Sequence, residues 1–200
     1  PEQSFLPVSW QHPFGTDSIG RDILSRVIYG TRISLALGAM VVLIALAIGV
    51  PLGGIAGYFG GVIDEVIMRV TDMFLSFPPL LLPLAIAAAL GPSLVNAMIA
   101  IGITWWPWYT RIIRGQALSL RERLFVEVAR SIGVKDRNII LKHILPNTIS
   151  PVMVQASMDI GYAILATAGL SFLGAGAQPP TPEWGLMVAS SRIYFLDYWW

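Results

Sequence analysis

Long apolar runs separated by short polar intervals dominate the chain. Four of them, at about residues 33–58, 62–90, 94–109 and 148–176, approach the length of about 20 residues that an α-helix needs to cross a bilayer. The runs are continuous rather than alternating, which indicates helices. The pattern therefore predicts an all-α polytopic membrane protein with four transmembrane helices.

Composition supports this class. Hydrophobic residues make up 55% of the 200 residues and charged residues only 12%, about half the charged fraction of a soluble domain. The net charge of +1 gives no reason to expect a nucleic-acid partner, and the absence of Cys excludes disulfides and thiolate metal sites. A soluble protein with a large core is the alternative that the long runs disfavour.

The ends of the sequence favour a piece of a longer protein. No signal peptide is visible, the sequence starts at Pro1 rather than Met, and it finishes on an aromatic cluster at Tyr198, Trp199 and Trp200. Aromatic clusters of this kind are typical of a membrane interface. We expect that both ends have been cut.

Residues 1–32 form a polar to amphipathic stretch that we interpret as an outer arm, distinct from a transmembrane domain at 33–200. Thr16 or Asp17 could cap a short helix there, with Ile19, Ile23 and Val27 on one face. Such a helix is too short and too polar to cross a membrane. We expect it to lie in the interface.

The first apolar run carries Gly49, Gly53 and Gly57 at four-residue intervals, which places them on one helix face. Small residues at this spacing let two helix backbones approach closely. Helix packing is the favoured interpretation, and a functional hinge at Pro51 is the alternative.

The second run is less regular. Arg69 follows Glu65 by four residues and precedes Asp72 by three, so ion pairs along one helix face are possible in either direction. Pro78 and Pro79 come next, and proline removes a backbone donor and bends a membrane helix. The pattern predicts a bent span.

The interval between the third and fourth runs is the polar and basic part of the chain. Eight of the thirteen Lys and Arg residues lie between Arg111 and Lys142, against three acidic residues. Basic residues beside helix ends set membrane orientation, so this loop is predicted to be cytoplasmic. By parity the turn at 91–93 and the arm then lie outside.

Within this loop, residues 118–147 predict a helical hairpin. Ser119 and Glu122 have the spacing of a capping box, which places a helix start near Leu120. Gly133 would end that helix, and a second helix with Asp136 as its N-cap would end at Pro146. Apolar residues recur on one face of the first helix, at Leu120, Leu124, Val128 and Ile132, widened by Phe125 and Ala129.

The same residues resemble a known motif. Glu127, Val128 and Ala129, followed by Gly133 and then by Leu145–Pro146, are similar to the EAA motif of ABC importer permeases, which reads E-A-A, three residues, G, nine residues, I, one residue, L-P. Two positions depart from it, because Val128 replaces the middle alanine and His143 stands where the motif has isoleucine.

Further motifs in the same order resemble the dipeptide, oligopeptide and nickel branch of these permeases, and the C-type subunit in particular. They are FGTD at 14–17, GRD at 20–22, LSR at 24–26, AGYFGG at 56–61, RGQ at 114–116, HILPN at 143–147, LSFLG at 170–174 and the proline-rich turn at 178–185. That resemblance implies the core of a type I importer permease, with the four spans here as the second to fifth of six.

The resemblance also implies a mechanism. In such importers the hairpin at 118–147 is a coupling helix that seats on a cytoplasmic ATPase, so Glu127, Val128, Ala129, Gly133, Leu145 and Pro146 would form the coupling element. The expected partners are a second permease subunit, ATPase subunits, an extracytoplasmic solute-binding protein and membrane lipid. This chain would bind no cofactor and no metal and would not be an enzyme, because ATP and Mg²⁺ are used by the ATPase subunits. The expected location is the cytoplasmic membrane of a prokaryote, and the expected substrates are di- and oligopeptides.

Three alternatives stay open at this point. Within the family, nickel or another small solute could be the substrate. A secondary transporter driven by an ion gradient would use an intramembrane acid such as Asp159, which could line a substrate path, together with the break at Pro78–Pro79. An intramembrane enzyme is disfavoured, because His12 and His143 both lie outside the spans and no catalytic motif is present.

Overall fold

The computed structural model describes residues 3–200, and within that range the chain is helical with no β-strand. Its elements are α1 (Ile23–Phe59), α2 (Gly61–Leu75), α3 (Leu81–Leu90), α4 (Leu94–Arg121), α5 (Leu124–Ser131), α6 (Asp136–Ile139), a π-helical turn (Ile140–Ile144), a 3₁₀ turn (Leu145–Thr148), α7 (Ile149–Phe172) and α8 (Trp184–Ser191).

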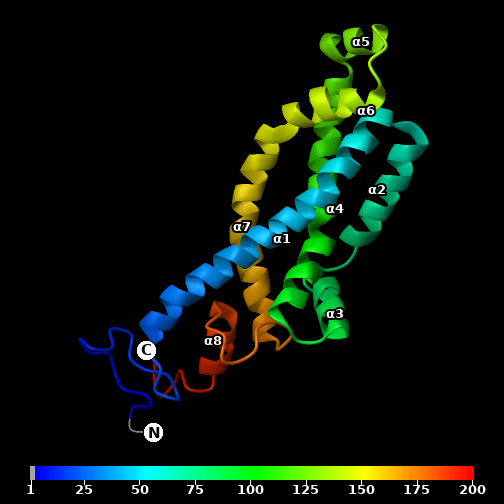
Figure 1. The fold of residues 1–200 in the computed structure, drawn as a ribbon. Helices are drawn as coiled ribbons and strands as arrows, with labels where there is room; N and C mark the ends of the chain where they lie inside the picture. The colour runs from blue at the N-terminus through cyan, green and yellow to red at the C-terminus, as the bar shows by residue number, and fades with distance from the viewer. Residues whose placement is uncertain (1–2) are drawn as a thin grey trace.

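Three long helices form the body of the molecule. Figure 1 shows α1, α4 and α7 running between two ends, with α5 and α6 at one end and the N-terminal arm and α8 at the other. α1 and the continuous helical path Asp136–Phe172, each 37 residues, are long and apolar enough to cross a membrane. The four predicted spans correspond to α1, α2 with α3, α4, and α7.

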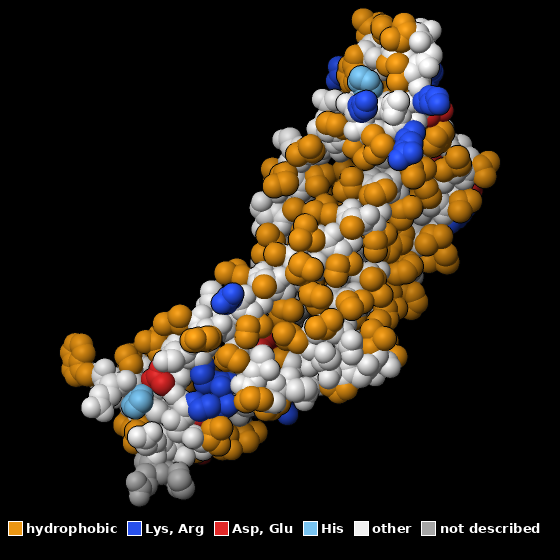
Figure 2. Space-filling model, in the orientation of Figure 1, with side chains coloured by type: hydrophobic (Ala, Val, Ile, Leu, Met, Phe, Trp, Pro, Cys, Tyr) orange, Lys and Arg blue, Asp and Glu red, His pale blue; other side chains and the backbone are white. Residues whose placement is uncertain are grey.

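Apolar side chains cover the outside of this body. In Figure 2 hydrophobic residues occupy the middle of the visible face, while Lys and Arg gather toward the two ends. Exposed apolar side chains on the long helices include Leu43, Val95, Val154 and Leu165. A surface of this kind suits lipid or another apolar partner rather than water.

The closest helix packing joins α1 to α4 at the glycine face. Gly49, Gly53 and Gly57 are all buried there. A Cβ atom on Gly49 would lie 2.6 Å from the carbonyl oxygen of Trp106, and one on Gly53 would lie 2.6 Å from that of Thr110. The two backbones are therefore in contact, with no room for a side chain between them. Pro51 lies inside α1 without interrupting it.

Small residues also dominate the shared core of the bundle. Alanines from several helices meet with a few larger side chains, and Tyr109 and Ile101 are fully buried. The members of this cluster are Val41, Val42, Ala45, Ala87, Ala97, Ala100, Ile101, Tyr109, Ala156, Ala163, Ala166, Leu170 and Ala175. Small side chains let neighbouring helices approach closely and so increase their van der Waals contacts. These contacts matter in a bilayer, because the hydrophobic effect does not drive helices together in lipid.

The arm does not contain the short helix that the sequence predicts. Asp22, not Thr16 or Asp17, caps the helix, because its Oδ2 accepts a hydrogen bond from the Ser25 N–H at 2.7 Å. The Asp17 carboxylate instead accepts a 2.6 Å hydrogen bond from Arg21 Nε, which folds the arm into turns. From Ile23 onward α1 continues across residue 32 without a break.

The second span is broken, as its prolines predict. α2 ends at Leu75, and α3 begins only after Pro78 and Pro79. Asp72 binds Arg111 of α4 at 2.6 Å and not Arg69, because α4 packs beside α2.

The proline-rich turn leads into α8, which ties α1 and α7 together. Glu183 is fully buried and caps α8, its two carboxylate oxygens accepting hydrogen bonds from the N–H groups of Gly185 and Leu186, both at 2.9 Å. The indole N–H of Trp184 donates to the carbonyl oxygen of Val27 at 3.1 Å. The end of the molecule near the arm is therefore closed by backbone and side-chain hydrogen bonds.

The glycine face generates a stability prediction. Gly53→Ala should lower the free energy of unfolding by about 1–3 kcal/mol, because the added methyl group forces α1 and α4 apart. Gly161→Ala, at an exposed position of α7 with no atom within 4 Å of the new Cβ, should leave stability unchanged or raise it by up to about 1 kcal/mol. Denaturant unfolding of the full-length subunit in detergent measures both, and equal effects would contradict the close contact.

Candidate functional site

The hairpin predicted at 118–147 exists, but its first helix starts later than the sequence suggests. Ser119 and Leu120 belong to the last turn of α4, and Glu122 is the C-cap of that helix. α4 continues this far because Ala117 is fully buried beneath the hairpin. The Glu122 carboxylate accepts a 2.8 Å hydrogen bond from Arg121, so the predicted capping box does not form.

Gly133 ends α5, as predicted. Its φ of +81° lies in the left-handed region that favours glycine. The Gly133 N–H bonds to the carbonyl oxygen of Arg130 at 3.0 Å, and the Val134 N–H bonds to that of Ala129 at 3.1 Å. This pair of hydrogen bonds defines a Schellman motif, which satisfies the free carbonyl groups at the end of the helix.

The return half of the hairpin departs from the prediction at both ends. Lys135, not Asp136, occupies the N-cap position of α6, and neither residue makes a side-chain cap bond. Pro146 does not end the helical path. A π-helical turn and a 3₁₀ turn carry the chain past the missing proline N–H and directly into α7, with Ile144 and Thr148 buried along the way.

The inner face of α5 is packed onto the ends of α1 and α4. Val126 is fully buried and Ala129 is 6% exposed. Both belong to a second apolar cluster, which we call the hairpin core, together with residues of α1, α4, α6 and the π-helical turn: Tyr58, Ala117, Ile139, Ile140 and Ile144. The hairpin is therefore attached to the body by buried side chains, not only by its two connections.

The outer face of α5 is apolar and uncovered. Leu124 and Ile132 are 73% and 75% exposed, and Phe125 and Val128 are exposed beside them. The predicted stripe is thus divided, because Ala129 faces the hairpin core while these four side chains face away. Figure 1 shows α5 projecting beyond the ends of the long helices. An exposed apolar patch on a projecting helix is typical of a protein–protein contact.

Glu127 and its neighbours complete the motif. The Glu127 side chain is exposed, and its carboxylate has no hydrogen bond or ion pair to any residue in the range 3–200. Val128 shares the outer face with it. Leu145 is half-buried against the hairpin core, and Gly54 of α1 lies close to the Leu145 side chain. The structure therefore separates the motif into outward residues and residues that hold the hairpin to the body.

A polar contact that sequence reasoning missed joins α1 to both halves of the hairpin. The Tyr58 hydroxyl donates a hydrogen bond to the Asp136 carboxylate, and the Arg130 guanidinium lies 5.4 Å from the centre of the Tyr58 ring. Contact with the Tyr58 hydroxyl and the nearby Asp136 charge raises the pKa of Arg130 above its ordinary value. The sequence contained Tyr58 only as part of a glycine-rich break, and nothing local indicates these partners.

Ion pairs brace the neighbouring helix ends. Arg114 of α4 donates two hydrogen bonds to Asp64 of α2, at 2.5 and 2.6 Å, in a bidentate arrangement. Charged pairs of this geometry fix orientation as well as distance. α2, α4 and the hairpin are thus held to one another at this end of the molecule.

Asp159 lies far from the hairpin and has partners inside the chain. It is 9% exposed, and its carboxylate accepts hydrogen bonds from the Tyr109 hydroxyl at 2.7 Å and from Gln155 Nε2 at 2.8 Å. The buried acid thereby connects α7 to α4. These contacts give Asp159 a structural role, and lining of a substrate path stays a prediction.

With this geometry established, comparison with known proteins defines the class. The family of binding-protein-dependent transport system inner membrane components matches residues 49–196, which contain the glycine face, the hairpin and α7. The chain belongs to this family of membrane transport permeases. Its fold is that of an ABC importer permease.

Individual relatives are similar over almost the whole chain. It is 52% identical over 195 residues to the probable D,D-dipeptide transport system permease protein DdpC of Escherichia coli, and 50% identical over 192 residues to the dipeptide transport system permease protein DppC of Alkalihalophilus pseudofirmus. It is also 50% identical over 184 residues to the glutathione transport system permease protein GsiD of Escherichia coli. These matches cover 98%, 96% and 92% of the chain but only 65%, 63% and 61% of the relatives, so the chain spans less than two thirds of their length.

A solved structure shows the same fold. An inward-facing form of the MetNI methionine ABC transporter superposes with a TM-score of 0.70 over 88% of this chain and 83% of that one. The sequence identity is 17%, so the likeness concerns the fold alone.

The Tyr58 contact generates a prediction about hairpin mobility. Tyr58→Phe removes the hydrogen bond to Asp136 and should speed amide hydrogen exchange across α5 and α6 by about fivefold to tenfold, the effect of losing one hydrogen bond. Tyr29→Phe, at a residue of α1 that is 72% exposed, is the matched control. Identical exchange in the two variants would show that the hydroxyl does not hold the hairpin.

The Asp159 contacts generate a second prediction. Asp159→Ala leaves the buried Tyr109 hydroxyl without its acceptor and should lower the free energy of unfolding by about 1–3 kcal/mol. Ser157→Ala, at an exposed position on the same helix, should change it by less than about 0.5 kcal/mol. Thermal unfolding in detergent compares the two, and wild-type stability of Asp159→Ala would remove the structural role.

Proposed function

We propose that this chain belongs to the membrane-spanning region of a permease subunit in an ATP-driven importer of short peptides. The observation that carries the proposal is the two-faced α5 helix. Its inner face is locked to α1 and α4 through the hairpin core, while its outer face presents four exposed apolar side chains beside the unpaired Glu127. An element built in this way can receive a force from another protein and pass it to the membrane helices.

The partner proposed for the outer face is a cytoplasmic ATPase subunit. Apolar side chains on one short helix suit a groove, and Glu127 supplies an acceptor for a donor on the other protein. ATP and Mg²⁺ would be used by that partner, and this chain contributes the transmission. The basic residues around the hairpin support a position on the cytoplasmic side, and the proposed location is the cytoplasmic membrane of a prokaryote.

Two further partners belong to the proposal. The glycine face is already occupied by α4, so a second permease subunit would contact the remaining exposed apolar surface. An extracytoplasmic solute-binding protein would deliver the substrate at the end of the molecule that carries the arm and α8. The family name itself describes transport that depends on a binding protein.

Short peptides are the proposed substrates because the similar permeases are named for them. DdpC, DppC and GsiD are named for transport of D,D-dipeptides, dipeptides and glutathione, which are all small peptides. Asp159 is retained as a candidate for the substrate path. Its hydrogen bond to Tyr109 of α4 would change if α4 and α7 moved relative to one another.

Changes to the motif test the coupling role. Glu127→Lys and Gly133→Leu should each reduce peptide uptake and co-purification of the ATPase subunits by about tenfold or more. The first change reverses the charge on the outer face, and the second places a β-carbon where φ is +81°. Uptake and co-purification that both stay at the wild-type level would contradict the coupling assignment.

A matched pair separates docking from general surface damage. Ile132→Asp puts a charge on the outer face of α5, and Leu196→Asp puts one on a residue 83% exposed near the arm, at the opposite end of the molecule. Only Ile132→Asp should release the ATPase subunits. Both variants should retain wild-type expression and thermal stability, because neither side chain is buried.

A further inference from the structure

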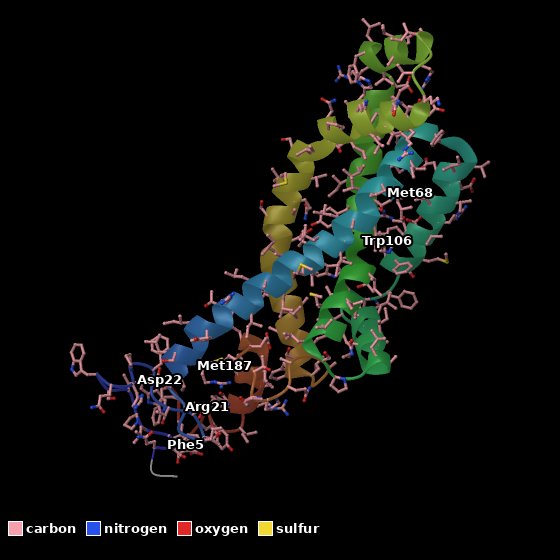
Figure 3. The ribbon with its side chains drawn as sticks, viewed as in Figure 1. Phe5, Arg21, Asp22, Met68, Trp106 and Met187 are labelled. Atoms are coloured by element: carbon pink, nitrogen blue, oxygen red, sulfur yellow. The ribbon has the colours of Figure 1, made fainter. Side chains whose placement is uncertain are left out.

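A cavity of about 230 Å³ lies at the end of the molecule opposite the hairpin. It is enclosed by the arm, the first turn of α1, α8 and the segment that follows α8. Figure 3 labels Phe5 and Arg21 of the arm and Met187 of α8, which line it from two of these elements. The motifs at 14–17 and 20–26 contribute to its wall, and the coupling role does not use them.

One wall of the cavity is aromatic. Phe5 stacks on Tyr198 with ring centres 4.0 Å apart, and the rings of Tyr194 and Trp200 lie beside Phe5 and Tyr198. Aromatic faces of this kind accept apolar or aromatic side chains. An apolar group of a ligand would therefore bind against this wall.

The acid in the cavity is already neutralised. The Asp17 carboxylate accepts hydrogen bonds from the backbone N–H groups of Ile19 and Arg21, at 3.1 and 2.9 Å, and from Arg21 Nε at 2.6 Å. With its oxygens occupied, Asp17 and Arg21 form a closed ion pair. This pair holds the arm in place and contributes no net charge to the cavity.

Arg26 is different, because its side chain is mostly enclosed and its two contacts with acceptors are long. Its side chain is 14% exposed, yet the nearest acceptors are Asp17 Oδ2, 3.9 Å from Nε, and the carbonyl oxygen of Pro180, 3.5 Å from Nη1. A guanidinium has five N–H donors in a planar fork suited to a carboxylate. Arg26 thus gives the cavity one positive charge with unused donors.

A second donor that lines the cavity lacks a hydrogen-bond partner among the described residues. The indole Nε1 of Trp200 is buried and makes no hydrogen bond to any residue in the part of the chain that the structure describes. A buried N–H without an acceptor is unfavourable, and such groups are usually satisfied by protein, water or ligand. Both underused groups are donors, so the missing component is an anionic acceptor.

The size of the cavity limits that component. Sites for drug-sized ligands occupy about 300–1,000 Å³, and this cavity is smaller. It suits one residue, or the end of a chain, with a single negative charge beside an apolar side chain. The C-terminal residue of a short peptide has this combination.

We propose that the cavity binds the C-terminal carboxylate of a short peptide through Arg26 and the Trp200 indole, with the last side chain of the peptide against the aromatic wall. This inference rests on the proposed function and adds a recognition site at the end of the permease where the substrate would arrive. A lipid phosphate is another source of an anion at this position. The experiment therefore includes a lipid arm.

The test uses the full-length subunit in its assembled complex in nanodiscs, without binding protein. Isothermal titration calorimetry compares the dipeptide Ala-Phe with Ala-Phe amide, which lacks the carboxylate charge. The free acid should bind about tenfold or more tightly, the effect of a charge-assisted hydrogen bond. Dihexanoyl phosphatidylglycerol is titrated as the lipid probe and should bind more weakly than the free acid.

Substitutions then assign the preference to the cavity. In Arg26→Gln the affinities for Ala-Phe and for Ala-Phe amide should differ by no more than about twofold. Arg32→Gln changes an exposed arginine on the same helix and should leave the ratio of the two affinities unchanged. Trp200→Phe retains the ring and removes the N–H, and should lower the ratio by about threefold to tenfold. If Arg26→Gln fails to assemble, the affinity ratio of Trp200→Phe decides whether the preference belongs to the cavity.

The result that overturns the proposal is a wild-type ratio near one, a ratio unaffected by both Arg26→Gln and Trp200→Phe, or tighter binding of the lipid probe than of the dipeptide. ATP-dependent uptake of the same dipeptide into proteoliposomes, with all subunits present, is measured in parallel. Absent uptake contradicts the proposed function, whereas uptake with a ratio near one contradicts only the cavity assignment.

Discussion

The contact between α1 and α4 is the constraint on which the rest of the structure depends. At Gly49, Gly53 and Gly57 the two backbones touch, so the helices cannot slide past one another as side chains rearrange. Both helices also end beneath the hairpin, where Tyr58 and Ala117 enter the same apolar cluster. The hairpin is consequently packed against the ends of two helices that are fixed to each other.

Polar groups inside the bundle are largely satisfied within the chain, which makes the exceptions informative. Arg114 is paired with Asp64, and Asp159 with Tyr109. Among the described residues, the buried side-chain atoms without a hydrogen bond are Ser34 Oγ in α1 and Trp200 Nε1 in the cavity at Arg26. The outer face of α5 is a different kind of exception, because it is apolar and uncovered. The outer face of α5 and the cavity lie at opposite ends of the molecule, which is consistent with the contacts that we propose for an ATPase and for a substrate.

Periodicity and local chemistry were enough to predict the spans, the break at Pro78–Pro79 and the glycine that ends α5. They failed where tertiary contacts outweigh local preference. Ser119 stays helical because the neighbouring turn of α4 packs into the hairpin core, and Asp136 binds Tyr58 instead of capping α6. The Tyr58 and Arg26 environments each depend on elements distant in sequence, which no local pattern contains.

The α8 segment has a mechanical consequence for the whole chain. The Trp184 indole is hydrogen-bonded to the Val27 carbonyl oxygen near the start of α1. Gly185 lies against α7 so closely that a Cβ atom on it would be 2.3 Å from the backbone of Ala168. At the other end, α1 and the path into α7 meet again in the hairpin core. The chain thus forms a closed frame, joined at both ends. In the importer that we propose, a passage for the substrate would then open beside this frame, at its contact with the second permease subunit, rather than through its middle.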